Sequence, residues 1–250
     1  MPEHPPAAIV TGGARGIGLA TALALAHKGY RIALSDLDGP DLAAAVERVA
    51  ATGIEVLALP GDVSAFALVG GHAAACLDRF GRIDVLVNNA GISQPKSLVE
   101  ISEDEWDRTI AVNLKSCFNW CKAVAPAMLA AGRGRIVNIS SVSAHTGGAR
   151  SAVSKFAYCT AKAGILGMTR ALAKELAPAV SVNAVCPGSI ETALTAGLIA
   201  ANREAITGTI PLGRIGTPED VAVVVAFLAT VEPNYLTGEI IDVDGGQWIN

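Results

Sequence analysis

The sequence predicts an α/β fold built on one doubly wound parallel sheet of about seven strands. Short apolar runs alternate with longer segments of helical pattern along the whole chain. These runs, such as Ile83–Asn88, are almost wholly hydrophobic, which is typical of strands covered by helices on both faces. No repeat, low-complexity tract or linker interrupts residues 1–250, so we expect a single domain.

Each expected strand is an apolar run that ends in polar or small residues. The strands are expected over Ala7–Thr11, Arg31–Asp36, Glu55–Leu59, Ile83–Asn88, Arg135–Ile139, Ser181–Val185 and Glu239–Val243. Strands that alternate with helices pair in parallel through right-handed crossovers. The carboxyl ends of the strands should therefore gather at one end of the sheet, where such folds bind ligands.

Capping residues and proline mark the ends of several expected helices. Ser102-x-x-Glu105 is a capping box that opens a helical region reaching about residue 131, with a kink expected at Pro126. Thr217 caps a later helix that has Pro218 at its first position. The other helices are expected over Gly16–Lys28, Asp41–Ala51, Ala65–Phe80 and Ala163–Ala177.

Composition excludes some classes of function. The chain is 51% hydrophobic and 17% charged, so it can bury a large core. A net charge of -4 argues against a nucleic-acid partner, which requires a basic patch. The five cysteines are an odd number without Cys-x-x-Cys spacing, so we expect reduced, mostly buried thiols and no metal site.

The location expected for this protein is the cytoplasm. Residues 1–6 form an expected flexible tail without the basic start and apolar run of a signal peptide. The longest apolar run, Val221–Val231, is too short to span a bilayer, so no membrane partner is expected.

A glycine-rich turn follows the first expected strand. In Thr11-Gly12-Gly13-Ala14-Arg15-Gly16-Ile17-Gly18 the glycines let the backbone approach a pyrophosphate, and the following helix directs its amide hydrogens there. The spacing differs from the Gly-x-Gly-x-x-Gly dinucleotide pattern. Its place between a strand and a helix still favours a dinucleotide site.

Carboxylates follow the next two strands. Asp36, 18 residues beyond Gly18, is placed to accept hydrogen bonds from a ribose diol. Its alternative role is to cap the next helix, for which Asp38 is better placed. Asp62 and Val63 either flank an adenine ring or make a turn.

Amides and hydroxyls follow the fourth and fifth strands. Asn88-Asn89-Ala90-Gly91 is either a structural turn or the floor of a cofactor site, and it can be both. Asn113 lies inside a helical pattern, where asparagine is unfavourable, so we expect it to make specific hydrogen bonds. Further candidate hydroxyls belong to Ser140, Ser141 and Ser143.

Tyr158 and Lys162 are four residues apart, so a helix places them on one face. An ammonium near a phenol favours the phenolate and should lower the pKa of Tyr158 from about 10. A tyrosine tuned in this way can exchange a proton with an alcohol or a carbonyl. Taken alone, this pair also occurs by chance on solvated helix faces.

Six motifs together resemble the short-chain dehydrogenase/reductase family over the whole chain. They are Thr11-Gly12-x-x-x-Gly16-x-Gly18, Asn88-Asn89-Ala90-Gly91, Asn113, the strand-end serine, Tyr158-x-x-x-Lys162 and Pro187-Gly188-x-x-x-Thr192. The resemblance implies a Rossmann-like fold and hydride transfer between a nicotinamide and a substrate carbon that bears oxygen.

The resemblance also assigns roles to individual residues. Tyr158 would be the acid/base, Lys162 would lower its pKa and hold the nicotinamide ribose, Ser141 would bind the substrate oxygen, and Asn113 would hold a proton-relaying water. The residues expected to bind the cofactor are Gly12, Arg15, Gly16, Ile17, Gly18, Asp36, Asp62, Val63, Asn89, Ala90, Gly91, Tyr158, Lys162, Pro187, Gly188, Ile190 and Thr192.

One departure from the family pattern concerns the substrate. The gap between Ser141 and Tyr158 is longer than usual, which leaves Ser140 and Ser143 as alternatives to Ser141. We expect Ser141, Ser143, Arg150 and Tyr158 to contact substrate. His145, in the same loop, is expected either to meet a polar substrate group or to be solvated. Residues 193–205 resemble the family's mobile lid.

The resemblance leaves several functions open. Because Asp36 disfavours the extra phosphate of NADP, we expect an NAD-linked dehydrogenase of a secondary alcohol, such as a polyol or sugar. The alternative is a 3-oxoacyl thioester reductase that uses NADPH. The non-enzymatic alternative is a dinucleotide-binding sensor or scaffold. Family members commonly form homotetramers, and the small residues along Ala161–Ala171 would permit close helix packing.

Overall fold

The computed structural model describes residues 5–148 and 154–249. Its centre is a seven-stranded sheet in the order β3-β2-β1-β4-β5-β6-β7, with every neighbouring pair parallel. The strands are β1 (Ala7–Thr11), β2 (Arg31–Asp36), β3 (Val56–Pro60), β4 (Val85–Asn88), β5 (Gly134–Ile139), β6 (Val180–Pro187) and β7 (Ile240–Val243). The predicted doubly wound sheet in a single Rossmann-like domain is confirmed.

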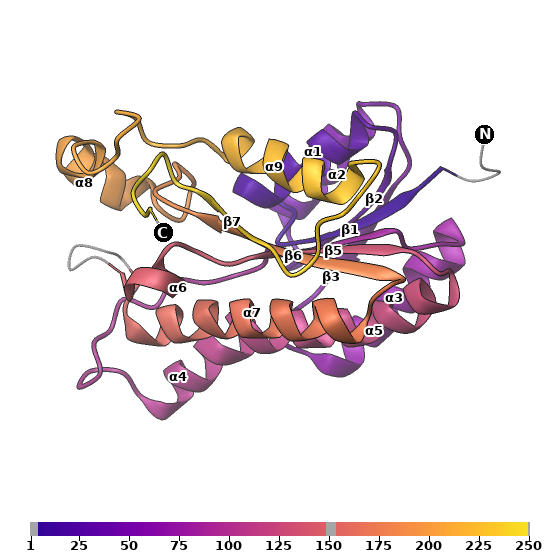
Figure 1. Cartoon of the computed structure of the whole chain (residues 1–250), viewed down its shortest axis with the longest axis horizontal. Coiled ribbons are helices and arrows are strands. Elements are labelled where there is room, and N and C mark those ends of the chain that lie inside the picture. Colours follow the sequence, from indigo (N-terminus) through magenta and orange to yellow (C-terminus); the bar gives the residue numbers. More distant parts are fainter. Residues whose placement is uncertain (1–4, 149–153, 250) are drawn as a thin grey trace.

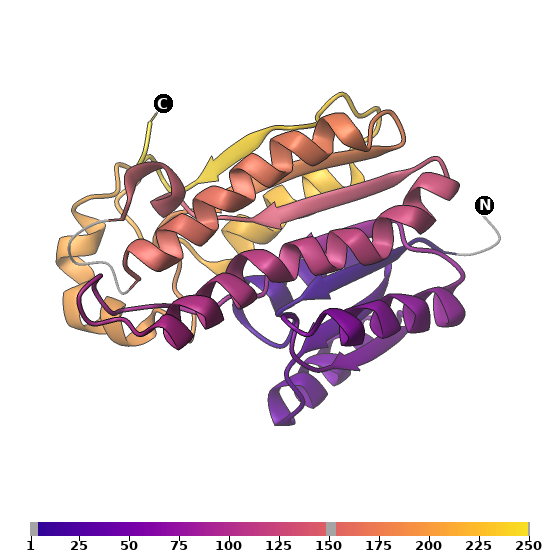
Figure 2. The same ribbon diagram turned by 90° about the horizontal axis from the view of Figure 1, so that it is seen from below.

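Helices cover both faces of the sheet (Figure 1). One layer contains α1 (Gly16–Ala26), α2 (Pro40–Ala50) and α9 (Pro218–Thr230). The other contains α3 (Phe66–Phe80), α4 (Glu103–Ile110), α5 (Ser116–Ala130) and α7 (Phe156–Glu175), and Figure 2 shows the long α5 and α7 lying across that face. Two apolar cores, one on each side of the sheet, hold these layers in place.

The end of the sheet that carries the carboxyl termini of the strands also carries two short segments of helix. One is α6 (Ser143–Thr146), which the sequence analysis did not predict. The other is α8 (Ala196–Thr207), which overlaps the segment 193–205 expected to be a lid. That the segment acts as a lid stays a prediction.

The second helical region contains a π-helical segment that the sequence did not predict. This segment, Ala111–Lys115, joins α4 to α5. The helix α5 continues through Pro126, and the kink expected there stays a prediction. Such segments often occur at functional sites, and this one carries Asn113. The capping box predicted at Ser102 and the cap predicted at Thr217 are both confirmed, and Thr217 forms a capping box with Asp220.

Membrane insertion by a helix finds no support in the described residues. None of their helices combines the length and the apolar character that crossing a membrane requires.

Candidate active site

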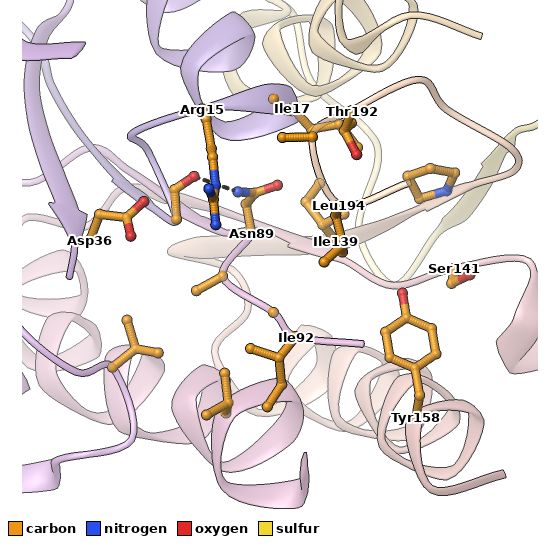
Figure 3. A pocket seen from close by; sticks show the side chains of 18 of the residues that line it. Arg15, Ile17, Asp36, Asn89, Ile92, Ile139, Ser141, Tyr158, Thr192 and Leu194 are labelled. Carbon is orange, nitrogen blue, oxygen red and sulfur yellow. Dashed lines mark hydrogen bonds between the residues drawn. The ribbon is translucent and has the colours of Figure 1, made fainter. Parts of the chain in front are cut away.

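One pocket lies at the carboxyl ends of the strands, and its lining runs from Asp36 to Tyr158 (Figure 3). It begins at the glycine turn after β1. Gly12 and Gly16 have φ of +60° and +54°, which favours glycine. A Cβ on Gly18 would lie 2.0 Å from the Gly12 carbonyl oxygen. The turn therefore closes tightly on the start of α1, whose first amides can receive a phosphate.

Asp36 ends β2 beside this turn, and its carboxylate is held by backbone amides. One oxygen accepts a hydrogen bond from the Ala14 N–H at 2.9 Å, and the other accepts from the Leu37 N–H at 2.8 Å. Arg15, on the same turn, forms an exposed ion pair with Asp41 at 3.5 Å. A negative charge therefore stands at this end of the pocket, and the nearby cation is directed toward another carboxylate.

The pocket wall around Asp62 includes a residue that sequence reasoning missed. Asp62 and Val63 line the pocket as expected, together with Arg108 of α4. The Arg108 guanidinium lies 2.6 Å from the Asp62 carboxylate and also donates to the Ser64 hydroxyl. Despite partial burial, hydrogen bonds from Ser64 and Arg108 lower the pKa of Asp62. No local pattern links Arg108 to Asp62, because 46 residues separate them.

The Asn89-Ala90-Gly91 segment is fastened to the glycine turn. The Asn89 side-chain amide donates to the carbonyl oxygens of Thr11 and Gly12 at 2.9 and 3.0 Å, and Figure 3 shows it in the middle of the pocket. The backbone N–H groups of Asn89 and Ala90 donate to the Thr11 hydroxyl. The segment is thus a structural turn and a wall of the pocket at once.

Asn113 makes the specific hydrogen bonds that were expected of it. Its Oδ1 accepts from the Ile92 N–H at 3.1 Å, and its Nδ2 donates to the carbonyl oxygens of Ile92 and Thr109. Asn113 is fully buried and lies behind the pocket wall, where a Cβ on Gly91 would be 2.8 Å from its Oδ1. The proton-relaying role assigned by resemblance stays a prediction.

Tyr158, Ser141 and Lys162 meet at the other end of the pocket. The Tyr158 hydroxyl points into it beside Ser141 in Figure 3. Lys162 is buried, and its ammonium donates to the Ile139 carbonyl oxygen at 2.8 Å. The ammonium nitrogen lies 5.6 Å from the centre of the Tyr158 ring. The helix α7 presents both residues on one face, as the spacing predicted.

The expected lowering of the tyrosine pKa is wrong for the protein alone. Burial raises the pKa of Tyr158 to about 12, and the hydrogen bond with Ser141 opposes this only in part. Burial also lowers the pKa of Lys162. The phenol is therefore the stable form of Tyr158 in this structure.

The segment after β6 closes the pocket. Pro187, Gly188, Ile190 and Thr192 line it as expected, and Ala193, Leu194 and Thr195 extend the lining. The Thr195 hydroxyl donates to the Ile190 carbonyl oxygen at 2.6 Å and accepts from the Thr192 N–H at 2.9 Å, which folds the segment into a compact turn. Leu194 brings an exposed apolar side chain to the rim.

The structure brings most of the predicted site residues together, with four differences. Asn113, Gly18 and Ser143 do not line the pocket in the described part of the chain. Ser143 instead begins α6, and its N–H donates to the Ser141 hydroxyl at 3.1 Å. Arg150, expected to contact substrate, lies outside the described residues. Ser140, weighed as an alternative to Ser141, also lines the pocket, as do Ala193, Leu194 and Thr195 of the segment expected to be a lid. Pocket residues that sequence reasoning missed are Leu37, Gly61, Ile92, Arg108, Val112 and Ile139.

The expectation that His145 is solvated is wrong, and its contact with a polar substrate group stays a prediction. Its Nε2 is 3.3 Å from a carboxylate oxygen of Asp242 on β7, and its ring stacks on Trp248 with the centroids 6.1 Å apart. The possible metal-ligating atoms of His145, Asp242 and Cys186 lie within 4.8 Å of one another, although the sequence suggested no metal site. Burial raises the pKa of the Cys186 thiol to about 11, so the protonated thiol is the stable form.

These residues fit a dinucleotide that binds across the strand ends. The glycine turn can receive its pyrophosphate, and Asp36 can accept hydrogen bonds from a ribose diol. The segment after β6 can hold the far end of the dinucleotide. The far end lies beside a tyrosine, a serine and a lysine that can act on an oxygen atom of a substrate. Fold and site together define a dinucleotide-dependent oxidoreductase.

Comparisons with known proteins give the family. The family model described as Enoyl-(Acyl carrier protein) reductase matches residues 12–247. The 3-oxoacyl-(acyl-carrier-protein) reductase of Thermotoga maritima is 42% identical over 246 residues, which cover 95% of this chain and 96% of that protein. Subunit BbsD of the (R)-hydroxy(phenyl)methyl-succinyl-CoA dehydrogenase of Thauera aromatica is 41% identical over 241 residues, 96% of this chain and 95% of that subunit.

A solved structure agrees with these relatives. A variant of actinorhodin polyketide ketoreductase with NADPH superposes with a TM-score of 0.91 at 33% identity, covering 97% of each chain. The chain belongs to the short-chain dehydrogenase/reductase family. It is an NAD(P)-dependent oxidoreductase that acts on CH–OH or keto groups, so the enzymatic prediction is confirmed over the sensor or scaffold. The relatives support the 3-oxoacyl thioester alternative better than the polyol or sugar dehydrogenase.

Proposed function

We propose that this protein interconverts 3-oxoacyl and 3-hydroxyacyl thioesters, with NAD(H) as its preferred cofactor. The observation that carries the proposal is the continuous pocket that joins Asp36 to the hydroxyls of Tyr158 and Ser141. The thioester is inferred from two relatives, since a 3-oxoacyl-(acyl-carrier-protein) reductase and a hydroxy-bearing acyl-CoA dehydrogenase both act on acyl thioesters.

The side chains of the chain itself would manage the substrate oxygen. The Tyr158 hydroxyl is protonated in the protein and would give its proton to the ketone oxygen during reduction. The Ser141 hydroxyl would donate a hydrogen bond to the same oxygen and so stabilise its developing negative charge. A bound nicotinamide supplies the hydride chemistry. Ile92, Ile139 and Leu194 give this part of the pocket an apolar lining suited to an acyl group.

The preference for NAD follows from charge. The Asp36 carboxylate would accept hydrogen bonds from the adenosine ribose diol, whereas the phosphate of NADP would bring like charge to the same place. Arg15 would have to leave Asp41 to reach that phosphate. This proposal departs from the ketoreductase structure with NADPH, so the cofactor is the point that most needs measurement.

The test is a panel of substrates assayed by absorbance of the reduced cofactor. It should contain a 3-oxoacyl-CoA, the matching 3-hydroxyacyl-CoA, the matching enoyl-CoA, and a set of polyols and sugars. We expect turnover of the first two and little of the others. Faster reduction of the enoyl thioester, or faster oxidation of a polyol, would overturn the 3-oxo group of an acyl thioester as the site of reaction.

Two further proposals concern assembly and the pocket entrance. The resemblance and the small residues of Ala161–Ala171 support a homotetramer, which a solution mass by light scattering would test. The position of Leu194 at the pocket rim, just before α8, supports a role for residues 193–205 in covering the substrate.

A further inference from the structure

The turn formed by residues 244–248 packs against two segments of the active site. Its start continues from β7, where the Val243 carbonyl oxygen accepts from the Gly188 N–H at 3.0 Å. The Gly245 carbonyl oxygen accepts from the Leu212 N–H at 3.1 Å. The turn therefore contacts both the segment that enters α8 and the segment that leaves it.

The side-chain amide of Gln247 joins these same two segments. Its Oε1 accepts from the Ser189 N–H at 2.8 Å, before α8. Its Nε2 donates to the Thr209 hydroxyl at 3.3 Å, just after α8. Only a side chain with an acceptor and a donor at its tip can make both bonds, so the amide is specifically suited to this place.

The fit around Gln247 shows that its position is fixed. A Cβ on Gly188 would lie 2.5 Å from Gln247 Oε1 and 2.6 Å from the Asp244 Cβ, so the turn is packed closely against the cofactor loop. The Asp244 carboxylate accepts from the N–H groups of Gly246 and Trp248 at 2.8 and 2.6 Å, which holds the turn in shape.

We infer that Gln247 is a positioning residue that ties the loop 187–192 to the base of the α8 segment and so sets the shape of the nicotinamide end of the pocket. Gln247 does not line the pocket, and it acts through the Ser189 backbone. The inference rests on the proposed function, since the resemblance assigns this loop to the cofactor.

The test uses Gln247→Met, which keeps the length of the side chain but removes both hydrogen bonds. In the protein without cofactor, the Ser189 amide should exchange its hydrogen about tenfold faster, because its acceptor is lost. The Kd for NADH, measured by fluorescence titration, should rise about fivefold, whereas kcat should change less.

Two variants of Thr209 are the matched controls. Thr209→Val removes the acceptor of Nε2 together with the bond that the hydroxyl donates to the Ile206 carbonyl oxygen at 2.7 Å. Exchange should therefore increase at residues 209–212, while the Ser189 amide stays protected by Oε1. Thr209→Ser keeps the hydroxyl and should restore wild-type exchange. If Gln247→Met does not fold, the two Thr209 variants still test the inference. Equal hydrogen exchange at residues 209–212 in both variants would overturn it.

The inference is also overturned if Gln247→Met folds and leaves both Ser189 exchange and the Kd for NADH within about twofold of wild type. Exchange and NADH binding are measured without substrate. A failure of the thioester assay would therefore not affect this result, and a failure here would leave the proposed reaction standing.

Discussion

Replacing Asp36 by Asn should remove most of the preference for NAD over NADP. The wild-type carboxylate is fixed by the amides of Ala14 and Leu37, so it cannot easily turn away from a bound phosphate. One like-charge pair at about 4 Å costs roughly 4 kcal/mol at an effective dielectric of about 20. Solvent reduces this, but a hundredfold preference requires only about 2.7 kcal/mol.

The choice of variants separates charge from hydrogen bonding. Asp36→Asn removes the charge but keeps an oxygen that can accept from the Ala14 N–H. Asp41→Asn releases Arg15 from its ion pair, so the double variant should use NADP better than either single one. We expect the wild-type ratio of kcat/KM for NAD to that for NADP to be on the order of a hundred, and Asp36→Asn to lower it at least tenfold.

The assay is steady-state kinetics with each cofactor at a fixed, saturating thioester concentration. Equal or better efficiency of the wild type with NADP would refute the charge argument. An unchanged ratio in Asp36→Asn would refute it as well. In either case the role of Asp36 would be to accept the hydrogen bond from the Ala14 N–H and so fix the glycine turn.

Four other results are expected. Tyr158→Phe should abolish turnover while the Kd for NADH stays within about twofold, and substantial remaining activity would show another acid/base. Ser141→Ala should lower kcat on the order of a hundredfold and Ser143→Ala much less, and a reversed ranking would reassign the serine. Because burial raises the pKa of Tyr158, alcohol oxidation should accelerate from about pH 6 to about pH 9, and a flat profile would contradict this. Dialysis against EDTA should leave turnover unchanged, whereas loss of activity together with bound metal would assign a metal to the residues around Asp242.

The sequence predicts best what depends on local pattern. The bounds of β1 and β2 agree with the predicted ranges Ala7–Thr11 and Arg31–Asp36, because apolar runs there end in a glycine turn and in acidic residues. The capping box at Ser102 is also a local signal. The residues gathered at the strand ends follow from the parallel order of the sheet rather than from any contact visible in sequence.

The sequence predicts poorly what depends on contacts between distant residues. The π-helical segment is accompanied by hydrogen bonds between Asn113 and Ile92, 21 residues apart, and no local pattern predicted it. The raised pKa of Tyr158 depends on burial, which spacing alone does not reveal. His145 meets Asp242 only because α6 packs near β7.

The position of α7, which carries Tyr158 and Lys162, is set by a chain of buried polar side chains that joins it to the sheet. Thr169 lies two helical turns beyond Lys162 and therefore on the same face of α7. Its hydroxyl accepts from Asn138 on β5 at 2.9 Å, and Asn138 accepts from Asn88 on β4 at 2.8 Å. Because a broken hydrogen bond would leave buried polar groups unpaired, these bonds resist rotation of α7 about its axis. The same rotation would move Tyr158, so the sheet fixes the tyrosine through a residue three turns away.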